Sequence, residues 1–458
     1  MTQGKNPLEG KKHLHFIGIG GSGMFPIVQI LHSRGYMITG SDNNESDIVK
    51  LVRGLGIQVH MGQRAENIQG ADLIVYTSAI MDDNPELIAA RASGVPLLER
   101  NDILGYITGQ YENTVCVCGT HGKTTTTAML TQILMDSGVD PTAVIGGKLP
   151  RIGGYGRVGN SDTMVCESCE FSDHFLKLHP DIAVILNVDE DHLDYFKTLE
   201  NIIRSFRTFA GMATKLVIYN GDDENTRKAV EGLDKKEVTF GFSETNDYYP
   251  LHITPLGGTR QSFDLYHKGD KLTEIRLNVA GRHNVLDAVA ACAAALSCGV
   301  LPKQLYLPLS EFNGAGRRFE LLGEVNGITI MDDYAHHPAE LRVTLEAAKK
   351  LDFKKVWAVF QPFTYSRTAL LFDDFVEVLQ IADRVVLSEI MGSREKNTYG
   401  IYSKDLCEKI PGSVWFNTFE EIKDYVLANA EPGDLVITLG CGDIYKAAKL
   451  MLGAAGRS

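Results

Sequence analysis

Short apolar runs alternate with longer helical patterns along the chain, and this alternation predicts strands separated by helices. Strands that alternate with helices favour an α/β fold built on parallel sheets. The runs predicted as strands are His13–Ile17, Tyr36–Thr39, Leu73–Thr77, Val95–Leu98, Thr114–Cys118, Thr163–Cys166, Ile182–Leu186, Leu321–Val325, Ile328–Met331, Val356–Phe360, Arg384–Leu387 and Leu435–Leu439.

The strand and helix patterns fall into three successive segments. A chain of 458 residues is long for one domain, and about three domains are expected. We expect an N-terminal Rossmann-like domain over residues 1–109, a central P-loop ATPase-like domain over 110–319 and a C-terminal Rossmann-like domain over 320–458.

The second segment opens with a glycine turn between a strand and a helix. Its residues are Gly119, Thr120, His121, Gly122, Lys123, Thr124 and Thr125. Such a turn directs backbone N–H groups at an anion, while Lys123 reaches the β- and γ-phosphates and Thr124 holds Mg²⁺. Val117 stands where the standard P-loop spacing requires glycine, so the turn is shorter than in GTPases. The pattern predicts ATP binding, and the alternative is a glycine turn with a chance Lys-Thr pair.

Two acidic positions follow the next strands. Glu167 ends an apolar run, where its carboxylate can face the Mg²⁺ on Thr124, and Glu170 is its rival for that role. Residues 187–194 form an acidic loop containing His192, which suggests a second cation with His192 as a ligand. We therefore expect Mg²⁺, two ions with Mn²⁺ as a possible substitute. A capping loop is the plainer alternative for residues 187–194.

The first segment carries a second glycine pattern. Gly18, Gly20 and Gly23 satisfy G-x-G-x-x-G between a strand and a helix, and Asp42 has the usual offset for a ribose contact. Taken alone, this predicts a nicotinamide dinucleotide, although such a pocket recognises a diphosphate rather than the nicotinamide. A purely structural turn is the alternative.

Polar clusters also follow strands in the third segment. Residues 332–338 and 360–368 both leave strands, and Arg367 can clamp a small carboxylate with two hydrogen bonds. Polar groups at the carboxyl ends of neighbouring strands predict a substrate site. Gly281–Asn284 either caps the Ala-rich helix over 285–295 or meets the adenine. Arg317 and Arg318 suit an anionic ligand or a hinge.

The composition excludes several classes of function. The formal charge of −13, from 45 basic and 58 acidic residues, argues against a nucleic-acid partner. The first twelve residues lack the apolar core of a signal peptide, and Ala288–Leu296 is too short to span a membrane. The eight cysteines lie mostly in apolar segments, as reduced thiols do. We expect a cytoplasmic protein without a membrane partner, and the sequence leaves monomer and homodimer open.

The order of these motifs resembles the Mur ligase family across nearly the whole chain. The matching segments are the N-terminal G-x-G-G-x-G-M, Gly119–Thr125, Asn187–His192, Gly281–Asn284, Arg317–Glu320, Asp332–Pro338, Phe360–Thr368 and Arg394–Lys396. The resemblance implies an ATP-dependent ligase that joins L-alanine to UDP-N-acetylmuramate through an acyl phosphate.

The resemblance also implies a role for each candidate residue. The UDP-sugar would contact Gly18, Gly20, Gly21, Ser22, Gly23, Met24, Asp42, Ser78 and His192. ATP would contact Gly119, Thr120, His121, Gly122, Lys123, Thr124, Thr125, His283, Asn284, Arg318 and Asp333. Thr124, Glu167 and His192 would hold metal, Tyr334, His336 and Arg367 the amino acid, and Lys123, His336 and Arg367 would be catalytic.

Some positions depart from the family pattern. Phe363 replaces a usual histidine, Asp287 replaces an asparagine, and Arg204 and Arg207 occupy the region where sister ligases carry a carbamylated lysine. The nearest alternative is a sister ligase that joins a preformed tripeptide to UDP-N-acetylmuramate. A nicotinamide dehydrogenase would leave Lys123 without a role, and a non-enzymatic nucleotide switch would not need the clusters at 332–338 and 360–368.

Overall fold

The computed structural model describes residues 6–392 and 395–454, so the first five residues and Arg394 lie outside it. The chain divides into two compact units. The first extends to Pro255 and continues with Gln261–Asn278 and Arg282–Phe312, and the second contains Leu256–Arg260, Val279–Gly281 and the chain from Asn313 onward.

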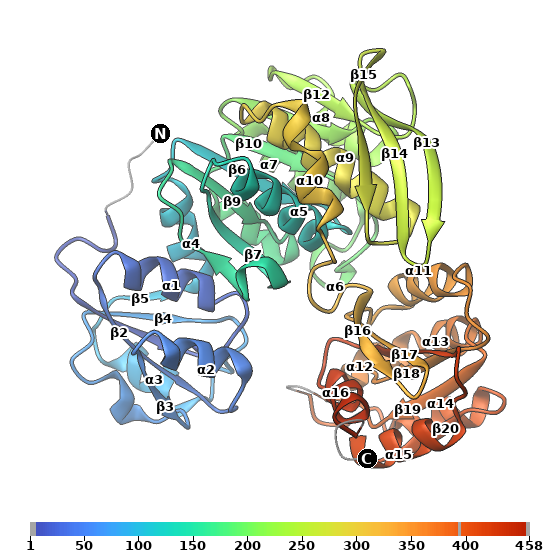
Figure 1. The fold of residues 1–458 in the computed structure, drawn as a ribbon. Coiled ribbons are helices and arrows are strands. Elements are labelled where there is room, and N and C mark those ends of the chain that lie inside the picture. The colour runs from blue at the N-terminus through green and yellow to red at the C-terminus, as the bar shows by residue number, and fades with distance from the viewer. Residues whose placement is uncertain (1–5, 393–394, 455–458) are drawn as a thin grey trace. The chain divides into compact units, whose positions relative to one another are not determined.

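The N-terminal part of the first unit is built on a parallel sheet with strand order β3-β2-β1-β4-β5. The order changes direction at β1, which is the arrangement of a Rossmann-like fold (Figure 1). Its elements are β1 (His13–Ile17), α1 (Phe25–Ser33), β2 (Met37–Asp42), α2 (Asp47–Gly54), β3 (Gln58–Met61), β4 (Leu73–Tyr76), α3 (Pro85–Ala92), β5 (Leu97–Glu99) and α4 (Arg100–Thr108).

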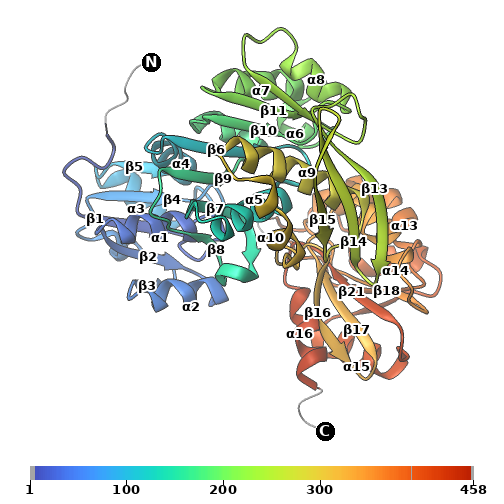
Figure 2. The same cartoon turned by 45° about the horizontal axis from the view of Figure 1, so that its top comes forward.

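The rest of the first unit surrounds a sheet of order β15-β14-β13-β12-β11-β10-β6-β9-β7-β8. Helices α5 and α9 pack against each other on this sheet (Figure 2). Its strands are β6 (Asn113–Cys118), β7 (Thr142–Leu149), β8 (Gly154–Arg157), β9 (Thr163–Glu167), β10 (Ile182–Ile185), β11 (Leu216–Asn220), β12 (Glu237–Phe240), β13 (Tyr248–Gly257), β14 (Arg260–His267) and β15 (Asp270–Leu277). Its helices are α5 (Lys123–Asp136), α6 (Leu193–Phe196), α7 (Leu199–Met212), α8 (Glu224–Val230), α9 (Arg282–Ser297) and α10 (Tyr306–Ser310).

The second unit contains a third sheet, of order β16-β17-β21-β18-β19-β20. Its strands are β16 (Glu320–Val325), β17 (Ile328–Asp333), β18 (Val356–Phe360), β19 (Arg384–Ser388), β20 (Val414–Phe416) and β21 (Leu435–Leu439). Its helices are α11 (Pro338–Lys349), α12 (Tyr365–Leu370), α13 (Phe372–Leu379), α14 (Ser403–Lys409), α15 (Phe419–Asn429) and α16 (Tyr445–Ala454).

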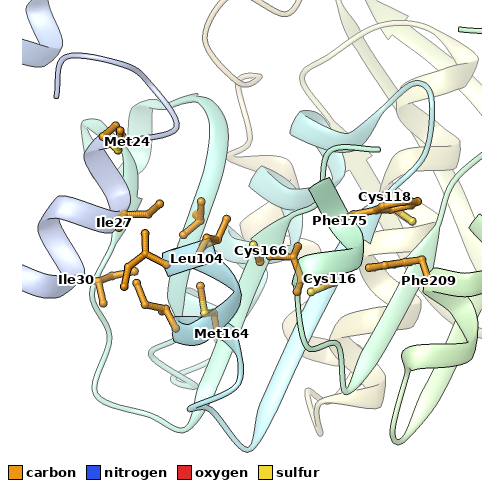
Figure 3. Close-up of a cluster of buried hydrophobic side chains, with 14 of the residues drawn as sticks. Met24, Ile27, Ile30, Leu104, Cys116, Cys118, Met164, Cys166, Phe175 and Phe209 are labelled. Carbon is orange, nitrogen blue, oxygen red and sulfur yellow. The ribbon is translucent and has the colours of Figure 1, made fainter. Parts of the chain in front are cut away.

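One buried cluster runs through both sheets of the first unit. It contains Met24, Ile27 and Ile30 around helix α1, and also Leu104 of α4 and Met164 of β9 (Figure 3). Full burial of an aliphatic side chain contributes about 1.5–3 kcal/mol. The apolar face of α1 is therefore shared between the N-terminal sheet and the central one.

The α/β prediction is confirmed, but the expectation of parallel sheets holds only in part. β14 and β15 pair antiparallel, as do β7 with β8 and β16 with β17. Helix α9 begins at Arg282, so His283 and Asn284 lie in its first turn rather than before it. The three sheets lie within the three predicted domains, whose boundaries stay predictions. No helix in the described part of the chain has both the length and the apolar character to cross a membrane.

Candidate active site

The phosphate loop connects β6 to α5. Gly119 and Gly122 have φ of 145° and 82°, a region that glycine adopts without a steric penalty. A Cβ on Gly119 would lie 2.9 Å from the Cβ of Leu186, and one on Gly122 would contact the Asp287 carboxylate. The turn is therefore packed closely between the end of β10 and helix α9, and it leads into the N-terminus of α5, where backbone N–H groups favour an anion.

Lys123 is held inside this loop by a buried carboxylate. Its Nζ lies 3.0 Å from Oε1 of Glu170 and donates to the carbonyls of Gly119 (2.6 Å) and Thr120 (3.1 Å). Burial by itself lowers the pKa of Lys123, but the charge of Glu170 and its hydrogen bond, together with the nearby Cys169 and Glu167, outweigh burial and raise this pKa above the usual lysine value. Lys123 is therefore charged at neutral pH and available to a phosphate.

Thr124 and Glu167 meet directly, as the strand pattern predicts. The Thr124 hydroxyl donates to Oε1 of Glu167 at 2.9 Å, and the Gly146 N–H donates to Oε2 at 2.6 Å. Glu170 instead pairs with Lys123. The two rivals thus have different positions, with Glu167 beside the hydroxyl and Glu170 beside the ammonium.

The oxygens of Thr124 and Glu167 are the kind of ligand that Mg²⁺ takes. Among the described residues, no group of three or more His, Cys, Asp or Glu side chains is arranged to hold a metal ion. Mg²⁺ commonly binds through one or two protein oxygens and completes its octahedron with water and substrate phosphates. Thr124 and Glu167 fit such a site, in which the nucleotide supplies further ligands.

The acidic loop after β10 lies against the phosphate loop. The Asn187 carbonyl accepts the Thr120 N–H at 3.1 Å, and its side-chain Oδ1 accepts the His121 N–H at 2.8 Å. His192 lies farther along, at the start of α6, with a φ of 52°. Its ring centroid is 4.8 Å from that of Phe171. The loop is thus brought to the phosphate site, while the metal role of His192 stays a prediction.

The first turn of α9 also lies beside the phosphate loop. Asn284 and Asp287 are 5% and 7% exposed, and the Asp287 carboxylate occupies the space next to Gly122. His283 is exposed. The residues assigned to adenine by resemblance are therefore on a helix that contacts the Gly119–Thr125 loop, and their contact with adenine stays a prediction.

The second glycine loop connects β1 to α1. Gly18 has a φ of 81°, and its N–H donates to the Ser41 carbonyl at 2.9 Å. The Gly20 N–H donates to the Asp42 carboxylate at 2.9 Å. Asp42 thus supports the loop in this structure, and its contact with a ribose stays a prediction. Ser78 follows β4 and is exposed.

Arg100 is a neighbour of this loop that sequence reasoning missed. A Cβ on Gly23 would lie 2.6 Å from Nη1 of Arg100, so the guanidinium lies against the loop backbone. Arg100 begins α4 directly after the end of β5. Its place at a strand end is the signal that would have drawn attention to it.

In the second unit, Asp333 ends β17 and is 6% exposed. It accepts hydrogen bonds from the N–H groups of Phe319 (2.6 Å) and Ala335 (2.8 Å). Burial raises its pKa to about 6, and the charge of Arg318 opposes this shift. The guanidinium of Arg318 lies 5.2 Å from the ring centroid of Tyr334.

His336 and Arg367 lie in the same region of the second unit. The His336 Nδ1 is 3.0 Å from the Tyr334 carbonyl and 3.2 Å from Oε2 of Glu340. Burial lowers the pKa of His336, an effect that Glu340 opposes and the Arg367 charge reinforces. Nη1 of Arg367 is buried without a hydrogen-bond partner among the described residues. An arginine in that condition suits an anionic ligand.

Phe363 adds an aromatic wall to this cluster. Its ring centroid is 6.3 Å from that of His336, and the Tyr334 ring is 5.6 Å from His336 on an edge-to-face contact. The rings of Phe363 and Tyr334 thus lie beside His336, and the role of this cluster toward a small amino acid stays a prediction. Glu340 contacts the His336 imidazole and was not predicted as a site residue. Its position in the first turn of α11 is typical of a helix-capping glutamate.

The first unit thus carries two glycine loops of the phosphate-binding type, and the second carries an arginine with a buried guanidinium nitrogen near an imidazole. This combination is typical of a nucleotide-dependent ligase. Family models agree over most of the chain: "Mur ligase family, catalytic domain" matches residues 13–112, "Mur ligase middle domain" 117–295 and "Mur ligase, glutamate ligase domain" 317–442. The chain belongs to the Mur ligase family.

Similar proteins of one enzyme name align with nearly the whole chain. A UDP-N-acetylmuramate–L-alanine ligase from Agathobacter rectalis is 45% identical over 439 residues, which are 94% of this chain and 96% of the relative. The enzyme of the same name from Caldanaerobacter subterraneus subsp. tengcongensis is 43% identical over 451 residues, 97% of this chain and 98% of the relative.

Solved structures share the fold. The UDP-N-acetylmuramate-alanine ligase from Thermotoga maritima gives a TM-score of 0.84 at 28% identity, covering 97% of this chain and 99% of that one. A murein peptide ligase from Psychrobacter arcticus gives a TM-score of 0.75 at 24% identity, covering 98% and 99%. The predicted three-domain α/β fold is thereby confirmed.

Proposed function

We propose that this protein joins L-alanine to the lactyl carboxyl of UDP-N-acetylmuramate, with cleavage of ATP to ADP and phosphate, in peptidoglycan precursor synthesis. The observation that carries the proposal is the presence of two glycine loops of the phosphate-binding type in the first unit, one of which holds Lys123 beside the buried carboxylate of Glu170. One loop serves the UDP diphosphate and the other serves ATP. A single-nucleotide enzyme has no use for both.

The first chemical step is proposed to occur at the loop over Gly119–Thr125. A carboxylate oxygen of the sugar substrate attacks the γ-phosphorus, the bond to the β-phosphate oxygen breaks, and ADP leaves behind an acyl phosphate. Two anions approach each other in this step, and Lys123 offsets their repulsion. Thr124 and Glu167 would hold Mg²⁺, which would supply further charge neutralisation, and His192 is the candidate ligand of a second ion.

The second step consumes the amino acid. Arg367 is proposed to bind the carboxylate of L-alanine, and the Nε2 of His336 to orient or accept a proton from its amine. The amine nitrogen attacks the acyl carbon, and the tetrahedral intermediate releases phosphate. The aromatic rings of Tyr334 and Phe363 restrict the space for the side chain.

The remaining properties follow from this assignment. UDP-N-acetylmuramate, ATP and L-alanine are soluble metabolites, so the protein is placed in the cytoplasm with no nucleic-acid or membrane partner. The roles of Asn284, Arg318 and Asp333 toward ATP belong to the same proposal.

Phosphate release tests the function. The protein is incubated with ATP, Mg²⁺ and UDP-N-acetylmuramate, and each common amino acid, or a preformed tripeptide, is added in turn. Release that depends on both the UDP-sugar and L-alanine is expected. Release that requires a preformed tripeptide and ignores L-alanine would replace this assignment with the sister ligase.

A further inference from the structure

A buried glutamate lies beneath the N-terminal glycine loop. Glu86, in the first turn of α3, is 0% exposed, as is His15 of β1. Its Oε1 is 2.7 Å from Nε2 of His15. Its Oε2 accepts the Ser41 hydroxyl at 2.7 Å and the Asn67 amide at 3.3 Å. One carboxylate thus gathers three segments that are far apart in the sequence.

The Ser41 contact leads directly to the loop. The Ser41 backbone carbonyl accepts the N–H groups of Gly18 at 2.9 Å and Ile19 at 3.0 Å. These two residues open the turn between β1 and α1. The position of the Ser41 peptide therefore sets the direction in which the loop leaves the sheet.

The Asn67 contact leads to the same loop by a second route. The Asn67 amide also donates to the Gly62 carbonyl at 3.0 Å, and the Gly62 N–H donates to the Asp42 carbonyl at 2.8 Å. The Asp42 carboxylate accepts the Gly20 N–H. Both residues at the end of β2 are thus fixed by hydrogen bonds that begin at Glu86.

Helix capping does not account for this carboxylate. The Asn84 side chain already caps α3 by accepting the N–H groups of Glu86 at 3.0 Å and Leu87 at 3.1 Å. Stability alone does not account for it either, because well-packed apolar residues often replace buried polar networks at no loss. The contacts of Glu86 instead end at the loop that presents N–H groups to a diphosphate.

We propose that Glu86 is a positioning residue for the nucleotide-sugar site, which fixes the Gly18–Gly23 loop through Ser41 and through Asn67. The inference rests on the proposed function only in taking UDP as the ligand of this loop. Glu86 does not contact the substrate. It limits the movement of the backbone donors, and small displacements of binding groups carry large costs.

The test measures UDP binding separately from catalysis. In Glu86→Gln the size is kept, but the negative charge is lost and an amide N–H replaces either the oxygen that accepts from Ser41 and Asn67 or the one that contacts His15. We expect the Kd of UDP by calorimetry, and the KM of the UDP-sugar, to rise about 10-fold, the low end for loss of an orienting partner behind a binding group. The KM values of ATP and L-alanine are expected to remain unchanged.

Leu87→Ala is the matched control. Leu87 is the next residue on α3 and is fully buried, so its truncation lowers the melting temperature without touching the network. UDP affinity should stay at the wild-type value in this variant. A loss of UDP affinity that follows the melting temperature equally in both variants would reduce Glu86 to a structural role.

Ser41→Ala keeps the proposal testable if Glu86→Gln does not fold. Ser41→Ala removes only the hydrogen bond from Ser41 to Glu86, so we expect a smaller rise in the UDP Kd than in Glu86→Gln. In the double variant, the effects of the two substitutions on the free energy of UDP binding should be less than additive. Wild-type UDP affinity in a folded Glu86→Gln protein would overturn the inference. A wild-type protein that binds UDP but does not ligate alanine would overturn the proposed function instead.

Discussion

Replacement of Lys123 by methionine separates the two tasks that the structure gives this residue. The variant keeps a long side chain but leaves the carboxylate of Glu170, which is 3% exposed, without its cation. Oε2 of Glu170 has no hydrogen-bond partner among the described residues, so little else compensates the charge. Lys123→Met is therefore expected to lower both stability and turnover.

The size of the stability loss follows from burial. Breaking a buried pair costs about 3–5 kcal/mol. The Lys123 side chain is 16% exposed. This partial exposure favours the lower end of that range of free energies, about 3 kcal/mol. At about 2–4 °C per kcal/mol for a large domain, the melting temperature of the first unit falls by roughly 6–12 °C. The pKa of Lys123 is raised on folding, so this contribution is complete at neutral pH and is lost only above about 10.4.

A second substitution distinguishes the two tasks. Adding Glu170→Gln to Lys123→Met removes the unpaired charge, so most of the lost stability should return. Turnover should stay about 10²–10³-fold below wild type, the usual cost of losing one stabilising group at a developing anion. Differential scanning fluorimetry and phosphate release at saturating substrates measure both quantities on the same proteins. Wild-type turnover in the double variant would refute a role for Lys123 in phosphoryl transfer, and an unchanged melting temperature in Lys123→Met would refute the energetics of the pair.

Three further predictions concern the second unit. Burial raises the pKa of Asp333 to about 6, above about 3.9 in the unfolded chain. The folded state therefore binds more protons between these values, and the free energy of unfolding falls by up to about 3 kcal/mol as pH rises through them. Asp333→Asn should remove this fall in urea titrations at pH 4 and 7, and an identical fall in the variant would contradict the assignment. Burial lowers the pKa of His336, so kcat/KM for L-alanine should stay level down to about 6.5 and decline only below it. His336→Gln should lower kcat about 10²-fold and abolish that acidic decline, whereas an unchanged profile would exclude His336 as the base. Arg367→Lys should raise the KM of L-alanine about 10-fold or more by loss of paired donors and leave the KM of ATP unchanged, and equal increases for both would contradict an amino-acid site.

Local patterns predicted the elements that carry the candidate nucleotide sites. The apolar run before Gly119 forms β6, as predicted, and the helical pattern that follows the loop forms α5, which begins at Lys123. Thr124 and Glu167 meet as expected because parallel strands present their carboxyl ends at one edge of a sheet. The sequence contains these features within short windows, so they are readable without the fold.

Features that depend on distant partners were not predictable in this way. The antiparallel pairing of β14 with β15 is the exception, because its turn is local: Lys268 and Gly269, with φ of 51° and 93°, connect the two strands. The partner of Lys123 is 47 residues away, and that of His15 is 71 residues away. No periodicity connects such positions, because their proximity results from how whole elements pack. The contact of Arg100 with the Gly23 loop was missed for the same reason. The start of α9, by contrast, was wrong by only a few residues.

The shared burial of α1 has a consequence for how the chain can be divided. Ile27 and Ile30 lie in the same apolar cluster as Met164, on the far side of the predicted boundary at residue 109. A fragment cut at that point would expose this face to water and lose a cooperative part of its folding energy. The N-terminal part and the central part of the first unit are therefore expected to fold as a single block, and a recombinant fragment that ends at residue 109 should be prone to aggregate.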